Sequence, residues 1–142
     1  ILISSKNKSE ELNKFIEKLK LKNISQVKQH SKDFRPWGWF DSIYKQNGYQ
    51  IKILCVKPKE SLSLQKHIHR SEHWVVVQGE AKVTIGKTIK KIKVGASVYI
   101  PIKVKHRLEN EHHLLDLIIV EVQTGTYLGE DDIIRYEDKY SR

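Results

Sequence analysis

From residue 49 onward, hydrophobic and polar residues alternate along the chain, which is the period of an extended strand with one buried face. The alternation is clearest at Tyr49, Ile51 and Ile53, which follow an Asn47-Gly48 pair typical of a tight hairpin turn. About ten short strands, separated by glycine, proline or polar turns, predict an all-β sandwich or barrel rather than alternating α/β units. The later runs cover residues 61–69, 73–77, 81–85, 89–94, 98–100, 107–109 and 114–122.

The N-terminal residues follow a different pattern. Asn7 followed by Glu10 resembles a capping box that begins a helix, and apolar residues then share one helical face. Such a face usually packs against a neighbouring element. Because residues 23–33 are polar and without periodicity, they indicate a linker. We therefore predict a short strand, an amphipathic helix and a linker in residues 1–33, and one β domain in residues 34–142; the helix face comprises Leu12, Phe15, Ile16 and Leu19.

The composition of the chain argues against nucleic-acid-binding and membrane proteins. The net charge is +9, but its 26 lysines and arginines are spread along the chain, so we expect no nucleic-acid binding. A diffuse positive field instead favours small anions such as sugar phosphates. The chain has no apolar run of roughly 18 residues and no secretory signal, which predicts a soluble protein rather than a membrane protein. Its single cysteine, Cys55, fits a reducing cytoplasm, and the absence of methionine predicts a fragment of a longer chain.

The predicted strand over residues 61–69 carries the first candidate chemistry. Alternation places Gln65, His67 and His69 on one face and Leu62 and Leu64 on the other. Inside a barrel, unpartnered polar groups cost about 1–3 kcal/mol each, so a bound metal is one partner that would satisfy them. The alternative is that this polar face simply lies in water.

Two segments of the chain resemble the two halves of the cupin signature, and matched spacing in both is far more specific than a lone His-x-His. The resemblance implies a double-stranded β-helix, a jelly-roll-like barrel, with a short N-terminal helical extension and one divalent metal. Lysine replaces glycine at the first position of the first half and at the third position of the second, and glutamine replaces the first histidine. The first half is matched by Lys59, Gln65, His67, Glu72 and Gly79, and the second by Gly95, Pro101, Lys103, His106 and Asn110.

Longer phrases narrow the resemblance to type II phosphomannose isomerases, the C-terminal domains of bifunctional mannose-1-phosphate guanylyltransferase/mannose-6-phosphate isomerases. These phrases are Arg35-Pro36-Trp37-Gly38, residues 64–77, residues 99–101, residues 106–110 and residues 121–133. The family's Gln-x-His pair implies that Gln65, His67, Glu72 and His106 bind the metal, with His69 as an alternative to Gln65. Two imidazoles, a carboxylate and an amide oxygen suit Zn²⁺ and also Mn²⁺, Co²⁺ or Fe²⁺.

The resemblance implies isomerisation of mannose 6-phosphate to fructose 6-phosphate, on the way to GDP-mannose. Such a reaction needs a base to move a proton, and Glu121 is the first candidate, with Glu109 as the second. Arg70 and Arg135 are expected to bind the phosphate, and Arg70 is also counted among the catalytic residues with Glu121. Both rank ahead of Arg107, which should face away from His106. The three tryptophans are expected to pack in the core.

Other functions remain open at the level of sequence. The chain lacks a glycine-rich nucleotidyl-transfer loop, so guanylyl transfer would need a separate upstream domain fused to it. One alternative function is a non-catalytic sugar-phosphate-binding or dimerisation module of such an enzyme, and another is a cupin dioxygenase. The resemblance also implies pairing into a homodimer.

Overall fold

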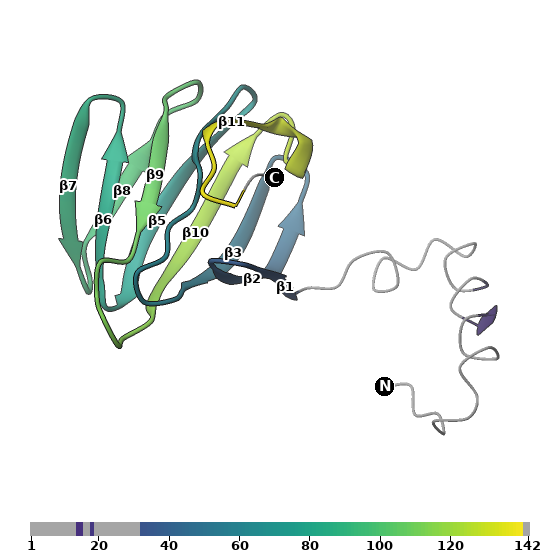
Figure 1. Ribbon diagram of the computed structural model, residues 1–142. Helices are drawn as coiled ribbons and strands as arrows, with labels where there is room; N and C mark the ends of the chain where they lie inside the picture. Colours follow the sequence, from purple (N-terminus) through teal and green to yellow (C-terminus); the bar gives the residue numbers. More distant parts are fainter. Residues whose placement is uncertain (1–13, 16–17, 19–31, 141–142) are drawn as a thin grey trace. The chain divides into compact units, whose positions relative to one another are not determined.

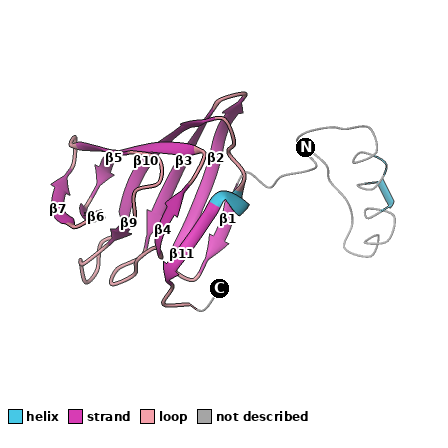
Figure 2. Cartoon of the chain, turned by 90° about the horizontal axis from the view of Figure 1, so that it is seen from above, coloured by secondary structure: helices cyan, strands magenta, loops and turns pink. Residues whose placement is uncertain are grey.

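Residues 32–140 form eleven strands and one short 3₁₀ turn, Glu130–Asp132, arranged in two antiparallel sheets (Figures 1 and 2). The computed structural model describes residues 14, 15, 18 and 32–140. The six-stranded sheet has the order β1 (Lys32–Arg35), β2 (Gly38–Gln46), β3 (Tyr49–Val56), β10 (Leu117–Gly125), β5 (Arg70–Gln78) and β8 (Ser97–Ile100). The five-stranded sheet has the order β11 (Ile133–Glu137), β4 (Leu64–His67), β9 (His106–Glu109), β6 (Glu80–Ile85) and β7 (Thr88–Lys93).

The all-β prediction is confirmed. Apolar side chains from the inner faces of both sheets meet in one buried cluster, which is the packing of a two-layer β barrel. The cluster includes Leu54 and Val76 from the larger sheet and Val83 and Leu108 from the smaller one. Trp37 and Trp74 lie in this cluster, as expected, but the expectation is wrong for Trp39, which is half-buried and has Lys32 Nζ 3.5 Å from its ring centroid.

Most of the N-terminal predictions concern residues outside the described part of the chain. The predicted short strand, amphipathic helix and linker fall in residues 1–31, of which only 14, 15 and 18 are described. The compact unit that contains the barrel starts at Lys32, so the predicted boundary after Asp33 lies within β1. In the described residues, no helix is long and apolar enough to cross a membrane.

A tight hairpin joins β1 to β2. Arg35 pairs with Gly38, so Pro36 and Trp37 form a two-residue turn. Gly38 has φ +150°, and a Cβ there would lie 1.9 Å from the backbone oxygen of Cys55 on β3. The glycine is therefore required for β2 to approach β3 so closely, and it fixes Trp37 in the core and Arg35 at the end of β1.

Both lysines that replace signature glycines keep the backbone that glycine favours. Lys59 has φ +62° and Lys103 has φ +64°, in the left-handed region. Non-glycine residues there carry a strain of about 1–3 kcal/mol. The two turns thus retain the geometry of the signature although the sequence departs from it.

The last part of the chain differs from the sequence-based expectation. The predicted strand over residues 114–122 begins only at Leu117, because His112 Nδ1 accepts hydrogen bonds from the backbone N–H groups of Leu114 and Leu115. Beyond this strand, the chain forms the 3₁₀ turn and then β11, which pairs with β4. Residues 133–137 therefore belong to the barrel.

Candidate metal centre and active site

Polar side chains occupy one end of the barrel interior. On β3, β5 and β10 the buried positions alternate with partly exposed ones, as in any strand with one inner face. At one end of these strands the buried residues are apolar, whereas at the other end they are charged or amide side chains. The polar set comprises Gln50, Lys52, Arg70, Glu72, Glu121 and Gln123.

Three candidate ligands come together at this end. His67 on β4, Glu72 on β5 and His106 on β9 are each at most 2% exposed, and their ligand atoms all lie within 4.8 Å of one another. His67 Nε2 is 3.0 Å from Glu72 Oε1, and His106 Nε2 is 3.6 Å from Glu72 Oε2. Residues far apart in the sequence thus share one centre.

The imidazoles have the free nitrogens that a metal needs. Both ring nitrogens of His67 and Nε2 of His106 are buried without a hydrogen-bond partner in the described part of the chain. His106 Nδ1 lies 2.9 Å from the carbonyl oxygen of Val104, which favours the tautomer with a lone pair on Nε2. Burial also lowers the pKa of His106, which keeps the ring neutral. Since orphaned buried nitrogens are costly, these residues fit a divalent cation.

Glu72 is held in its ionised form. Its Oε1 accepts hydrogen bonds from Arg70 Nε at 3.3 Å and Gln123 Nε2 at 3.1 Å, and its Oε2 accepts one from Trp74 Nε1 at 3.1 Å. Burial alone would raise its pKa, but His67, His106 and Arg70 around it hold the pKa of Glu72 well below its usual range. An ionised carboxylate is the form that coordinates a cation.

Of the two candidates for a fourth ligand, the structure brings Gln65 to this end of the barrel. Gln65 is buried, lies opposite His106 in the register of β4 and β9, and accepts a hydrogen bond from Ser63 Oγ at 2.9 Å. The expectation that His69 shares this face is wrong, because β4 ends at His67 and the alternation stops there. The half-exposed His69 ring instead has Nδ1 2.8 Å from Asp132 Oδ1.

Glu121, the first candidate base, is buried beside the candidate metal ligands. Its Oε2 accepts a hydrogen bond from Trp74 Nε1 at 2.9 Å, and its Oε1 accepts one from Gln123 Nε2 at 2.8 Å. Burial, followed by the nearby charge of Glu72, raises the pKa of Glu121 to about 8. A carboxyl group tuned toward neutral pH is typical of a proton-transfer residue. Glu109, the second candidate, lies outside this cluster and interacts with Lys82 at 3.5 Å.

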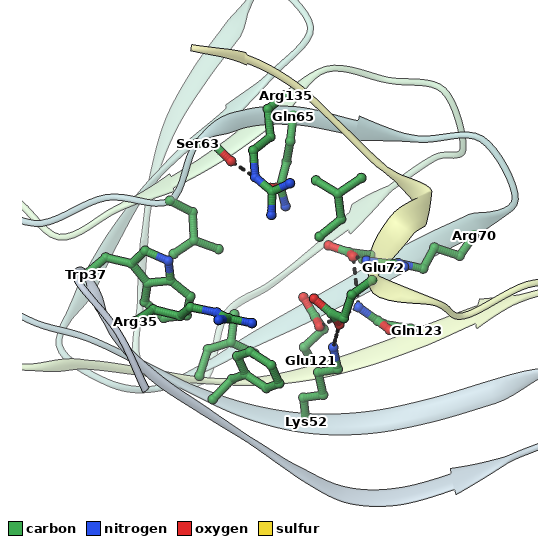
Figure 3. A pocket seen from close by; sticks show the side chains of 15 residues that line it. Arg35, Trp37, Lys52, Ser63, Gln65, Arg70, Glu72, Glu121, Gln123 and Arg135 are labelled. Atoms are coloured by element: carbon green, nitrogen blue, oxygen red, sulfur yellow. Dashed lines mark hydrogen bonds and ion pairs between the residues drawn. The ribbon is translucent and has the colours of Figure 1, made fainter. Parts of the chain in front are cut away.

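A cavity lies next to this cluster, and Figure 3 shows Glu72, Glu121 and Gln123 close together on one side of it. Arg70 and Arg135 both line the cavity, as expected for substrate-binding residues. Arg70, however, is only 2% exposed, and its Nη1 also donates to the carbonyl oxygen of Gly129 at 2.7 Å. Arg107 lies elsewhere and donates to Glu137.

Several residues of the site were not predicted from the sequence. Arg35 and Lys52 also line the cavity, and Trp74 bridges two carboxylates in addition to packing in the core. The alternation on β5 and β3 was a usable signal, because it places Trp74 on the face of Glu72, and Lys52 on the face of Leu54. No local pattern in the sequence identifies Arg35, whose side chain reaches the cavity from the edge strand β1.

Comparisons with known proteins agree with the sequence and the geometry. Residues 22–138 match the family model described as the mannose-6-phosphate isomerase C-terminal domain. Over its whole length the chain is 46% identical to a mannose-1-phosphate guanylyltransferase of Salmonella montevideo and 44% identical to the xanthan biosynthesis protein XanB of Xanthomonas campestris. The chain spans about 30% of the length of these curated relatives.

Solved structures support the fold independently. A double-stranded β-helix protein from Klebsiella pneumoniae superposes with a TM-score of 0.60 at 19% identity, covering 69% of this chain and 78% of that one. At this identity the likeness shows a shared cupin barrel and nothing about activity. Taken together with the match over residues 22–138, the barrel and the residues gathered inside it show that this chain belongs to the mannose-6-phosphate isomerase C-terminal family.

Proposed function

We propose that this chain is a metal-dependent isomerase domain that interconverts mannose 6-phosphate and fructose 6-phosphate. The observation that carries the proposal is the convergence of two imidazoles and an ionised carboxylate around one buried centre, beside a cavity that contains a second carboxyl group. The family match supports the choice of substrate. The longer relatives, which are named as guanylyltransferases, support fusion to an upstream nucleotidyltransferase domain.

Gln65, His67, Glu72 and His106 would hold a divalent cation, either Zn²⁺ or one of Mn²⁺, Co²⁺ and Fe²⁺, because the donor set suits all four. When bound, the cation would supply a Lewis acid that makes the C–H group beside the sugar carbonyl more acidic. Gln123 and Trp74 hydrogen-bond both carboxyl groups and so hold Glu72 and Glu121 in place.

Glu121 is the group that moves the proton between C1 and C2 of the sugar, through an enediol. Its ionised form accepts the proton, and its protonated form then gives the proton to the adjacent carbon. The raised pKa of Glu121 brings the proton affinities of the carboxyl group and the carbon closer together. Arg70 is a positioning residue in this scheme, because its guanidinium is buried against Glu72 and the Gly129 carbonyl group. It therefore holds the carboxylate and the β10–β11 connection, rather than the substrate.

The decisive experiment is an isomerase assay on this chain with mannose 6-phosphate in deuterated water. We expect fructose 6-phosphate to form, deuterium to enter the reacting carbon, and both signals to disappear with a chelator and return with added metal. Tight sugar-phosphate binding without product would support the non-catalytic module instead, and an oxygen-dependent product would support a dioxygenase.

A further inference from the structure

Arginine and lysine side chains surround the cavity, but they differ in what they already bind. Lys52, which is buried, donates from Nζ to Glu130 Oε1 at 2.5 Å. Arg70 is bound to Glu72 and to the carbonyl oxygen of Gly129. Each of these two cations therefore already pairs with a carboxylate inside the protein, which offsets its charge.

Arg135 is different because its guanidinium has no hydrogen-bond or ion-pair partner within residues 32–140. It projects from β11 on the same side of the strand as Ile133, and both residues line the cavity. The residue is exposed, so it lies at the rim of the cavity rather than at its base. A guanidinium offers five donors in a planar fork, which suits a phosphate group.

Arg35 reaches the same cavity from the opposite end of the described chain. Figure 3 shows Arg35 and Arg135 directed into the cavity from two sides. The Arg35 side chain is 34% exposed, lies 5.5 Å from the centroid of the Phe40 ring, and has Nη2 2.6 Å from Asp33 Oδ2. Because Asp33 is itself 40% exposed, this ion pair is worth little and leaves the guanidinium available for a stronger anion.

We propose that Arg35 and Arg135 together form the subsite for the phosphate group of the substrate, at the rim of the cavity. The subsite rests on the proposed isomerase function and assigns the second arm of the clamp to Arg35 in place of Arg70. A phosphate at the rim keeps part of its hydration shell, while the sugar carbons reach Glu121 and the metal-binding residues deeper inside. The site therefore selects phosphorylated sugars over neutral ones, since the paired forks have no role with a hydroxyl group.

Each arginine of the subsite lies on an edge strand, β1 in the six-stranded sheet and β11 in the five-stranded sheet. Arg35 is held at the end of β1 by the Pro36-Trp37 turn, and Arg135 is held by the pairing of β11 with β4, where it lies opposite Gln65. The first and the last strand, β1 and β11, thus contribute one arginine each to the subsite. Asp33 pairs with Arg35, and Glu130, which lines the cavity, pairs with Lys52, so these ion pairs limit the repulsion of the substrate by the two carboxylates.

The test compares Arg35→Gln, Arg135→Gln and the double variant with the matched control Arg107→Gln, whose arginine lies outside the cavity. Calorimetric titration with inorganic phosphate and with mannose 6-phosphate measures binding without requiring turnover. Each single variant should bind both probes about 10- to 100-fold more weakly, because a charge-assisted hydrogen bond is lost. Metal content and melting temperature should stay at the wild-type values, and the control should bind as the wild type does.

The outcomes separate the subsite from the isomerase proposal. If the chain binds phosphate through both arginines but forms no product, the subsite stands and the isomerase function fails. If product forms and the double variant keeps the wild-type KM, the subsite is wrong and the function stands. Absence of phosphate binding to the wild-type chain, or an equal loss in Arg107→Gln, also overturns the subsite.

Discussion

The two ends of the barrel interior are built from the same strands but serve opposite purposes. At one end, the inner faces of β3, β5 and β10 present apolar residues, each of which contributes about 1.5–3 kcal/mol by its burial. At the other end the same faces present charged and amide groups, whose burial costs free energy unless every group is paired. The apolar residues are Leu54, Val56, Trp74, Val76, Leu117 and Ile119.

This contrast separates the residues that stabilise the fold, at the apolar end, from the candidate functional residues, at the polar end. The three hydrogen bonds that Glu72 accepts and the two that Glu121 accepts offset the cost of the polar end only in part, since three imidazole nitrogens there have no hydrogen-bond partner within residues 32–140. A substitution at the apolar end should therefore lower stability and spare the chemistry. A substitution at the polar end should do the reverse.

The largest expected effect is on catalysis at the polar end. Glu121→Gln keeps the shape of the side chain but removes the proton-transfer group, so kcat should fall about 10²- to 10⁴-fold. The free energy of unfolding should change little, because the pKa of about 8 keeps the buried Glu121 carboxyl group largely neutral at pH 7, as the amide is. Steady-state kinetics and urea denaturation measure the two quantities, and a kcat within a few-fold of wild type would exclude Glu121 as the base.

The matched change at the apolar end is Ile119→Ala, two residues earlier on the same face of β10. Ile119 is fully buried, so the cavity left behind should lower the free energy of unfolding by about 2–5 kcal/mol. Metal content per folded chain should stay unchanged at low temperature. A loss of metal without a loss of stability would show that the two ends are not separable.

Trp74 lies where the two ends meet, so Trp74→Phe should affect both. The apolar ring is largely kept, but Nε1–H no longer serves Glu72 and Glu121. Leaving these buried acceptors short of a donor should cost about 1–3 kcal/mol of stability and lower the activity as well. An activity loss with wild-type stability would mean that water replaces the missing donor.

The smallest expected effect concerns the strained turns, outside both ends. Lys103→Gly should raise the free energy of unfolding by about 0.5–1 kcal/mol, because relief of backbone strain exceeds the extra entropy of the unfolded chain. Lys90→Gly, in β7 and without a positive φ, is the control and should be destabilising. If the two changes shift the melting temperature equally, the backbone at Lys103 is not strained.

The sequence predicted most of the barrel and the triad of His67, Glu72 and His106 that the structure gathers. The barrel follows from the two-residue period of strands, and the triad was implied by the resemblance to the cupin signature. The features that the sequence did not predict depend on contacts between segments that lie far apart in the sequence. The side chain of His69 turns to Asp132, and the strand β11 forms only because β4 offers it an edge.

The arginines show the same limit. Arg70 was predicted to bind the substrate because a guanidinium fork suits a phosphate, yet its side chain is bound to Glu72, two residues along the same strand, and to the carbonyl group of Gly129, which only the fold brings close. Arg35 was not predicted at all, since a residue on an edge strand reaches the cavity only after the sheet has formed. Sequence spacing identifies which groups are present, whereas the packed barrel decides which of them are free.

The most direct test of the account is the metal content of the purified chain, measured by elemental analysis together with circular dichroism. We expect one divalent metal per wild-type chain. We also expect Glu72→Gln and His106→Gln, while still folded, to retain metal at least ~100-fold less tightly, because even indirect partners of a ligand are worth 10- to 100-fold. A folded wild-type chain that binds no metal, or folded variants that bind it as tightly, would contradict the central claim.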